Sequence, residues 1–295
     1  MTVEELAAQV MARSGPAGPD TSGVTRPMPA VVLLRQTSPS ALDPTMYEPV
    51  VCLILQGRKE TFLGDERFEF GPGESLLVTH DVPVNARVTV ATPTTPYLAL
   101  ILQLDFALLR SLESELQAPH TADPPPRSVV LQRAPSALIG AFARYLACAA
   151  DATEARVVGP LILREIHFRL LAAPQGSMLR HLLRHDSHAS AISRAIAHLR
   201  RDFRAPISVP RLARDIGMSP STFHKHFKDI TSTTPLQYQK DLRLLEARQL
   251  LRVAGRAVST VAFEVGYESP NQFSREYTRK FGVPPRADLA AHLVA

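Results

Sequence analysis

The chain has 295 residues, of which 45% are hydrophobic and 21% are charged, and its formal net charge is +5. This length exceeds that of most single domains, and the hydrophobic content excludes disorder along the whole chain, so two domains with separate cores are expected. Two cysteines are too few for a disulfide framework, and we interpret Cys52 and Cys148 as small buried hydrophobic residues.

The sequence gives no sign of membrane insertion or export. No apolar stretch reaches the roughly 18 residues that a membrane-spanning helix needs. The nearest, residues 97–109, is interrupted by Gln103 and Asp105. Glu4 and Glu5 stand where a secretory signal would carry basic residues. The sequence therefore predicts a cytoplasmic protein without membrane contact.

The first part of the chain changes character near residue 30. Residues 13–29 are rich in glycine and proline, a composition that cannot bury enough apolar surface to offset the cost of ordering, so we expect a flexible leader over 1–29. Short β-rich runs such as VVCLILQ then alternate with turn residues as far as position 109. They predict an antiparallel β barrel or jelly roll over 30–115.

A second proline-containing stretch, 118–127, precedes helical patterns over 136–150 and 156–171. In the later helix an apolar set that includes Leu161 and Phe168 leaves charged residues to solvent, which suits packing or self-association. We interpret 116–187 as a linker with helices that supports a homodimer.

Basic charge is concentrated in the last third of the chain. Residues 188–295 hold 17 Lys and Arg against 9 Asp and Glu, a net +8, whereas the remainder has a net charge of −3. Such asymmetry is typical of a domain that binds phosphate groups. Helices are predicted over 190–203, 209–216, 220–230, 235–253, 258–265 and 270–281, so this domain is all-α and the whole chain is α+β.

Two copies of one unit lie inside this helical region. The first reads LARDIGMSPSTFHKHFKDITSTTP from Leu212, and the second reads VAFEVGYESPNQFSREYTRKFGVPP from Val261. In each, a short helix ends at a glycine, a serine caps the next helix, and a proline occupies its first turn. This order predicts two helix-turn-helix units joined by the long helix over 235–253.

The second helix of each unit has a polar and basic outer face. In the first unit the side chains opposite the aromatic stripe include Ser221, His224 and Lys225. In the second unit Asn271, Ser274 and Arg275 occupy the same side. Asn can bond adenine through two atoms and Arg can do so with guanine, so these faces favour reading of base edges in the major groove.

The segment 188–293 resembles the DNA-binding domain of the AraC family, including the helix PLQYQKDLRLLEARQLL, and residues 47–88 resemble the cupin-like sensor domain of one branch of that family. The resemblance implies a transcription regulator that binds promoter double-stranded DNA and responds to a small-molecule effector. Ser232 departs from the pattern, since the family's first unit usually has Gly there.

The resemblance and the helix faces together assign the site residues. Base contacts are expected from Ser221, His224, Lys225, Asn271, Ser274 and Arg275. Phosphate contacts are expected from Lys228, Arg279 and Lys280, which lie near the ends of the recognition helices. The effector, its site and the direction of regulation stay open, and no residue marks a surface for RNA polymerase, which is a further candidate partner.

Two other functions remain as alternatives: a cupin-type enzyme fused to a DNA-binding controller, and a nonspecific architectural DNA binder. The enzyme has little support, because His80 is the only histidine before His120 and no nucleophile, phosphate-loop or metalloprotease motif is present. We therefore expect a non-enzymatic protein without metal or cofactor, in which His80 is structural. The turn Gly57-Arg58-Lys59 could bind an anion, but basic residues are common in hairpin turns.

Overall fold

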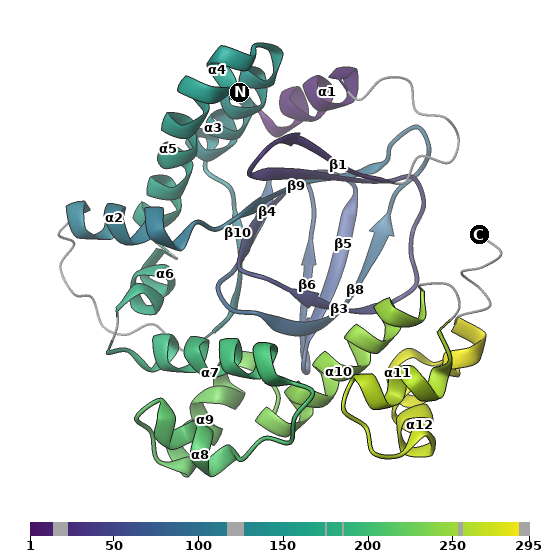
Figure 1. Cartoon of the computed structure of the whole chain (residues 1–295). Helices are drawn as coiled ribbons and strands as arrows, with labels where there is room; N and C mark the ends of the chain where they lie inside the picture. Colours follow the sequence, from purple (N-terminus) through teal and green to yellow (C-terminus); the bar gives the residue numbers. More distant parts are fainter. Residues whose placement is uncertain (14–22, 117–126, 175, 185, 253–255, 289–295) are drawn as a thin grey trace.

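The structure, a computed structural model, describes residues 1–13, 23–116, 127–174, 176–184, 186–252 and 256–288. It consists of an N-terminal β domain covered by helices and a C-terminal helical domain, as Figure 1 shows. The predicted α+β class, with an antiparallel β domain followed by an all-α domain, is confirmed.

The β domain contains two antiparallel sheets that face each other. The first sheet has the order β1 (Gly23–Met28), β2 (Val31–Gln36), β9 (Tyr97–Gln103), β4 (Val50–Gln56), β7 (Glu74–Val78) and β10 (Val129–Arg133). The second has the order β3 (Asp43–Tyr47), β8 (Val82–Val90), β5 (Arg58–Leu63) and β6 (Glu66–Phe70). Apolar side chains from both sheets, among them Ile54, Leu76 and Val84, form the core between them.

The larger sheet is buried on both faces, which explains why its strands have nearly continuous apolar runs instead of alternating ones. Its outer face packs against helices from three parts of the chain, and these share one core with Leu53 and Leu100. The helices and the short 3-10 turn of this region are α1 (Val3–Arg13), α2 (Phe106–Leu116), α3 (Ser136–Ala147), η1 (Cys148–Ala150), α4 (Ala152–Val157), α5 (Gly159–Ala172) and α6 (Gly176–Leu183).

The expected flexible leader over 1–29 is wrong for its described residues. Val3, Leu6, Ala7 and Val10 recur at helical spacing and are buried, so α1 is an amphipathic helix held by the core. β1 likewise pairs with β2. Glycine and proline are concentrated between these two elements, in residues 14–22, which lie outside the described part.

The segment 116–187 holds a strand as well as helices. β10 pairs antiparallel with β7 along its whole length, from Val129 opposite Val78 to Arg133 opposite Glu74. It therefore belongs to the β domain, although it follows α2. Most of the proline-containing stretch 118–127 lies outside the described residues.

Each helix expected in the C-terminal domain forms within a few residues of its predicted range. They are α7 (His188–Asp202), α8 (Val209–Asp215), α9 (Pro220–Thr231), α10 (Pro235–Leu251), α11 (Val258–Glu264) and α12 (Pro270–Phe281). In the described part of the chain, every helix is too short or too polar to cross a membrane.

The two domains are joined by polar contacts from α7 and α10. The His80 imidazole donates from Nε2 to the Ala189 carbonyl oxygen at 3.1 Å. Arg200 forms ion pairs with Asp81 and, at 2.7 Å, with Glu48. The Tyr238 hydroxyl donates to the Asp81 carbonyl oxygen at 2.9 Å. Further along α10, Arg248 bridges Asp43 of β3 and, at 3.0 Å, Asp288.

These contacts predict a pH-dependent stability. Burial lowers the pKa of His80 to about 4 from an ordinary value of 6.5, because the charged imidazolium is poorly solvated there. The unfolded state then binds more protons between these two values. The contribution of the neutral His80 to the free energy of unfolding should be complete above pH 6.5. The free energy of unfolding should then fall by on the order of 3 kcal/mol as the pH is lowered to 4.

The measurement is urea unfolding of the wild type and of His80→Gln from pH 7 to pH 4. Gln keeps a donor for Ala189 but does not titrate, so the wild type should lose stability more steeply than the variant. Parallel curves for the two proteins would contradict the assignment.

Candidate nucleic-acid interface

The first helix-turn-helix unit consists of α8, a short turn and α9. The Ser219 hydroxyl oxygen accepts from the Thr222 backbone N–H at 3.2 Å, and Pro220 lies in the first turn, where no backbone donor is needed. Phe223, Phe227 and Ile230 are buried and hold α9 against the core of the unit. The predicted cap and apolar stripe of α9 are therefore present.

The second unit, α11 and α12, repeats this construction. Ser269 caps α12 by accepting from the Gln272 backbone N–H at 3.3 Å, and Phe273 and Tyr277 are buried. Gly266 in the turn has a φ of +92°, and a Cβ there would lie 2.2 Å from the Arg204 carbonyl oxygen. Only glycine fits this close approach between the turn and the chain that follows α7.

The expected contact residues of α9 lie on one exposed face. Ser221, His224, Lys225 and Lys228 are all exposed and stand opposite the buried aromatic stripe. Because they recur at helical spacing, they can reach one groove together.

On α12 the structure separates the expected residues into two groups. Asn271, Arg275 and Arg279 are exposed on the outer face. Ser274 is half-buried, and its hydroxyl donates to the Pro270 carbonyl oxygen at 2.9 Å. Lys280 faces inward and pairs with the buried Asp241 of α10 at 2.9 Å. Lys280 thus differs from the other expected phosphate contacts, because its charge is already paired within the protein.

α10 carries both units. At its start Tyr238 packs edge-on against Phe227 of the first unit, with ring centroids 5.5 Å apart. In its second half Leu244, Ala247 and Leu251 belong to the core of the second unit. The helix has 17 residues, which corresponds to about 26 Å at 1.5 Å per residue.

Ion pairs and hydrogen bonds fix α12 on α10. Lys240 pairs with Glu276 at 2.9 Å, and the Tyr267 hydroxyl donates to the same carboxylate at 2.8 Å. Burial acts to raise the pKa of Glu276, but the bonds from Lys240, Tyr267 and Gln272 outweigh it and lower that pKa. The second recognition helix is therefore held in position through a Glu276 carboxylate that remains ionised at neutral pH.

A histidine pair joins α7 to the first recognition helix, and its members are too far apart in the sequence to have been predicted as neighbours. The rings of His188 at the start of α7 and His226 on α9 have centroids 4.0 Å apart. Burial lowers the pKa of His226, and the charge of His188 lowers it further. As expected, His224 and His226 point in different directions, since His224 is exposed and His226 is half-buried. In the described residues no group of three or more His, Cys, Asp or Glu could hold a metal ion.

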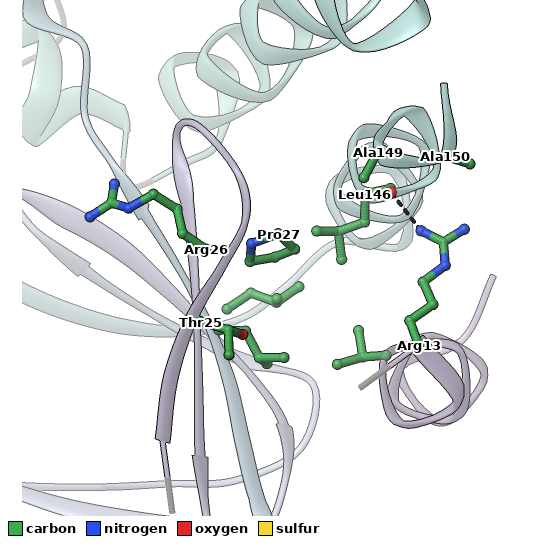
Figure 2. Close-up of a pocket in the computed structure, with 10 residues that line it drawn as sticks. Arg13, Thr25, Arg26, Pro27, Leu146, Ala149 and Ala150 are labelled. Carbon is green, nitrogen blue, oxygen red and sulfur yellow. Dashed lines mark hydrogen bonds between the residues drawn. The ribbon is translucent and has the colours of Figure 1, made fainter. Parts of the chain in front are cut away.

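The β domain has a cavity on its helical side, shown in Figure 2. It measures about 570 Å³ and lies between α1, the strands β1, β2 and β9, and the end of α3. Its walls include Leu33 and Leu100. Arg13 reaches across the rim and donates to the Leu146 carbonyl oxygen at 2.5 Å, whereas Arg26 extends to the other side. The cavity can accept an apolar group, but its rim arginine is already hydrogen-bonded.

Comparison with known proteins agrees with this architecture. The family model of the AraC-type transcriptional regulator N-terminus matches residues 27–178, and that of a helix-turn-helix domain matches residues 212–290. The chain belongs to the AraC family of transcriptional regulators.

Similar proteins include the transcriptional activator RhaS of Escherichia fergusonii, 36% identical over 125 residues, and RhaS of Escherichia coli O139:H28, 33% identical over 124 residues. The match covers 42% of this chain and 44% of each relative, so the chain spans less than half the length of the curated relatives it matches.

Solved structures show where the whole fold recurs. Unsaturated fatty acid bound ToxT from Vibrio cholerae has a TM-score of 0.59 at 11% identity, over 92% of this chain and 96% of that one. An apo ToxT variant from the same strain has a TM-score of 0.58 at 10% identity, over 88% and 97%. At these identities the likeness concerns the fold alone.

The residues that end the two recognition helices should differ in backbone strain, because one is a serine and the other a glycine. Ser232 ends α9 in the left-handed region, with a φ of 57°, and Gly282 ends α12 at 75°. A side chain in this region costs about 1 kcal/mol that glycine avoids. Ser232→Gly should therefore raise the free energy of unfolding by about 0.5–1 kcal/mol, and Gly282→Ser should lower it by a similar amount.

Denaturant unfolding monitored by circular dichroism measures both variants against the wild type. If Ser232→Gly lowered the free energy of unfolding as much as Gly282→Ser does, the prediction would be wrong. The contacts of the Ser232 side chain would then outweigh the backbone strain.

Proposed function

We propose that the protein is a transcription regulator that binds specific promoter DNA through α9 and α12 and responds to a small-molecule effector bound by its β domain. The proposal is carried by the exposed polar and basic faces of two helices, α9 and α12, that both pack on α10. No enzymatic step is part of it. We propose that the protein acts in the cytoplasm, where promoter DNA is reached.

The geometry of α10 supports binding to one face of a double helix. α10 is about 26 Å long, and the recognition helix at each end adds its own width. The separation between α9 and α12 therefore suits the roughly 34 Å between successive major-groove segments on one face of the duplex. On this basis α9 and α12 enter adjacent segments. Ser221, His224, Lys225, Asn271, Ser274 and Arg275 are the proposed base contacts, and Lys228 and Arg279 the proposed phosphate contacts. Lys280 is not among the proposed phosphate contacts, because its charge is paired with Asp241.

Effector control requires that a ligand prefer one arrangement of the two domains. The interface gives a physical basis for such a preference, because Arg200 and Arg248 on the DNA-binding side pair with Glu48 and Asp43 at either end of β3. A ligand that shifts this strand would change both ion pairs at once. That a ToxT structure of the same fold holds an unsaturated fatty acid supports a response to small molecules.

A homodimer is proposed to form through α5. Leu161 and Phe168 lie seven residues apart on α5 and are 65% and 40% exposed, so they share one helix face. Val157, the last residue of α4, is a further exposed apolar side chain, at 58%. Ion pairs flank the α5 face, including Arg164 with Glu115 at 2.6 Å. An apolar centre with a charged rim is typical of an interface between two proteins, and the same face would be used by both copies.

The proposed function is tested by binding of the purified protein to DNA fragments from around its own gene, with excess unrelated competitor and rising salt. A retained complex whose footprint covers two major-groove segments about one turn apart would support it. Complete displacement by unrelated DNA would instead indicate a nonspecific architectural binder.

Arg275 and Arg279 should respond differently to mutation. Arg275→Ala should weaken binding to the specific site by about 1–3 kcal/mol while leaving nonspecific binding almost unchanged, because a base contact is lost. Arg279→Ala should weaken both and reduce the slope of log K against log salt by about 1. Fluorescence anisotropy titrations at several salt concentrations measure both quantities. An equal loss on specific and unrelated DNA for Arg275→Ala would remove it from the base-reading set.

The proposed dimer interface predicts that a charged side chain on the exposed face of α5 weakens self-association. Leu161→Glu should raise the dimer dissociation constant by at least roughly tenfold, because two carboxylates would meet in an apolar contact. The control Val90→Glu places the same charge at a side chain that is 50% exposed on β8. Sedimentation equilibrium compares the two variants. The proposed interface fails if Leu161→Glu associates as strongly as the control.

A further inference from the structure

Histidines hold the start of α7 from two sides, where this helix lies between the β domain and the first helix-turn-helix unit (Figure 1). On one side, the His80 imidazole of the β domain donates to the Ala189 carbonyl oxygen at 3.1 Å. On the other side, His188, the first residue of α7, stacks on His226 of α9, with ring centroids 4.0 Å apart and planes tilted by 33°. The histidine pair is thus a direct link between α7 and the first recognition helix.

His226 borders the buried stripe of α9. It lies three residues after Phe223 and four before Ile230, both buried, so its ring is turned toward α7 and away from the exposed face. Its Nδ1 atom is buried and has no hydrogen-bond partner among the described residues. A neutral imidazole can leave this nitrogen unprotonated, whereas an imidazolium would carry a buried N–H without an acceptor. The surroundings of His226 therefore favour the neutral ring.

The charges close to His226 give an added proton little compensation. Burial lowers the pKa of His226, and the charge of His188 on α7 lowers it further. On α9 itself, Asp229 acts to raise this pKa and Lys225 acts to lower it, and the net result is a lowered pKa. A proton on His188 and a proton on His226 thus disfavour each other.

The other elements around the pair do not supply a counter-charge. The cavity that His188 lines also holds Asp186 and Arg194, whose opposite charges largely offset each other. Among the described residues, the carboxylates of the segment before α7 and of α7, α8 and α10 have basic partners. These pairs are Asp186 with Arg184, Asp202 with Arg201, Asp215 with Arg211, Asp241 with Lys280 and Glu246 with Arg204.

We propose that the stacked pair of His188 and His226 positions the first recognition helix at neutral pH and separates when both rings are protonated, so that specific DNA binding weakens on acidification. This inference rests on the proposed function, because it concerns the DNA-binding surface of α9. One proton leaves a neutral ring stacked on a charged one. A second proton would place two like charges about 4.0 Å apart in a partly buried site, where their repulsion is poorly screened.

The direction of the response distinguishes this pair from other histidines. Because the pKa of His226 is lowered from 6.5, the stability that its neutral form contributes is complete above pH 6.5 and is lost as the pH falls. Protonation of the exposed His224 would act in the opposite direction, since it adds positive charge to the DNA-facing surface. His80, with a pKa of about 4, stays neutral at pH 5.5, so its link to α7 persists there.

The second unit provides an internal control. α12 is fixed to α10 through Glu276, which pairs with Lys240 at 2.9 Å. The pKa of Glu276 is lowered from 4.5, so this carboxylate remains ionised at pH 5.5. Acidification should therefore weaken the DNA contacts of α9 and leave those of α12 in place.

The test measures binding of the full chain to its footprinted DNA site from pH 7.5 to pH 5.5, with EDTA present so that no metal ion bridges the rings. Wild-type affinity should fall by about tenfold, the effect of a pKa difference of about one unit, and the footprint should weaken over one of its two segments. His188→Phe keeps a ring for stacking but cannot be charged, so its affinity should change by less than about threefold. The control His198→Phe makes the same substitution at an exposed position further along α7 and should follow the wild type.

Histidine titration by NMR gives a readout that does not depend on DNA. In the free protein the pKa of His226 should rise in His188→Phe, because a neighbouring charge is removed, and should stay unchanged in His198→Phe. An unchanged pKa of His226 in His188→Phe would overturn the inference. Wild-type binding that does not weaken at pH 5.5, or that weakens equally in His188→Phe, would overturn it as well.

The two readouts separate this inference from the proposed function. Displacement by unrelated DNA, together with coupled titration of the two rings, would refute the regulator and support the pair as a pH-dependent contact. Specific DNA binding with uncoupled titration would refute only the pair.

Discussion

The packing of α10 between the two helix-turn-helix units is the constraint on which the rest of the structure depends. Tyr238 belongs to the core of the first unit and Leu244 to that of the second, so neither recognition helix can move independently of this helix. The pairs Lys240 with Glu276 and Lys280 with Asp241 then fix the rotation of α12. Because the two outer faces keep a fixed separation, a sequence on DNA can be selected by spacing as well as by base contacts.

α10 also contacts the β domain, so a shift in the β domain can be transmitted to the DNA-binding domain. Arg248 of α10 and Arg200 of α7 pair with Asp43 and Glu48 on either side of β3. These pairs are partly exposed, so each is worth little alone and can be exchanged at low cost. An interface built from such contacts suits a protein that must change its domain arrangement in response to a ligand.

Local signals in the sequence predicted the C-terminal domain well, because caps such as Ser219 and Ser269 act within one helical turn. Features that depend on distant partners were missed. α1 was not predicted because a Gly and Pro-rich stretch follows it. β10 was not predicted because it is a short run, VVLQR, whose place in the sheet depends on its pairing with β7. Lys280 was expected to contact phosphate because it lies near the end of the recognition helix, and its pairing with Asp241 depends on a residue of another helix. Lys59 lies within β5 and contacts the Tyr47 ring, which the hairpin sequence does not reveal.

The most direct test of the account changes the spacing between the two contacted major-groove segments of a footprinted site. An insertion of about 5 base pairs, half a helical turn, places the two segments on opposite faces of the duplex. If α10 holds the two recognition helices as one rigid pair, the affinity should fall by on the order of 100-fold, to near that of one unit alone. Unchanged affinity after the insertion would show that the two units bind independently and would contradict the central claim.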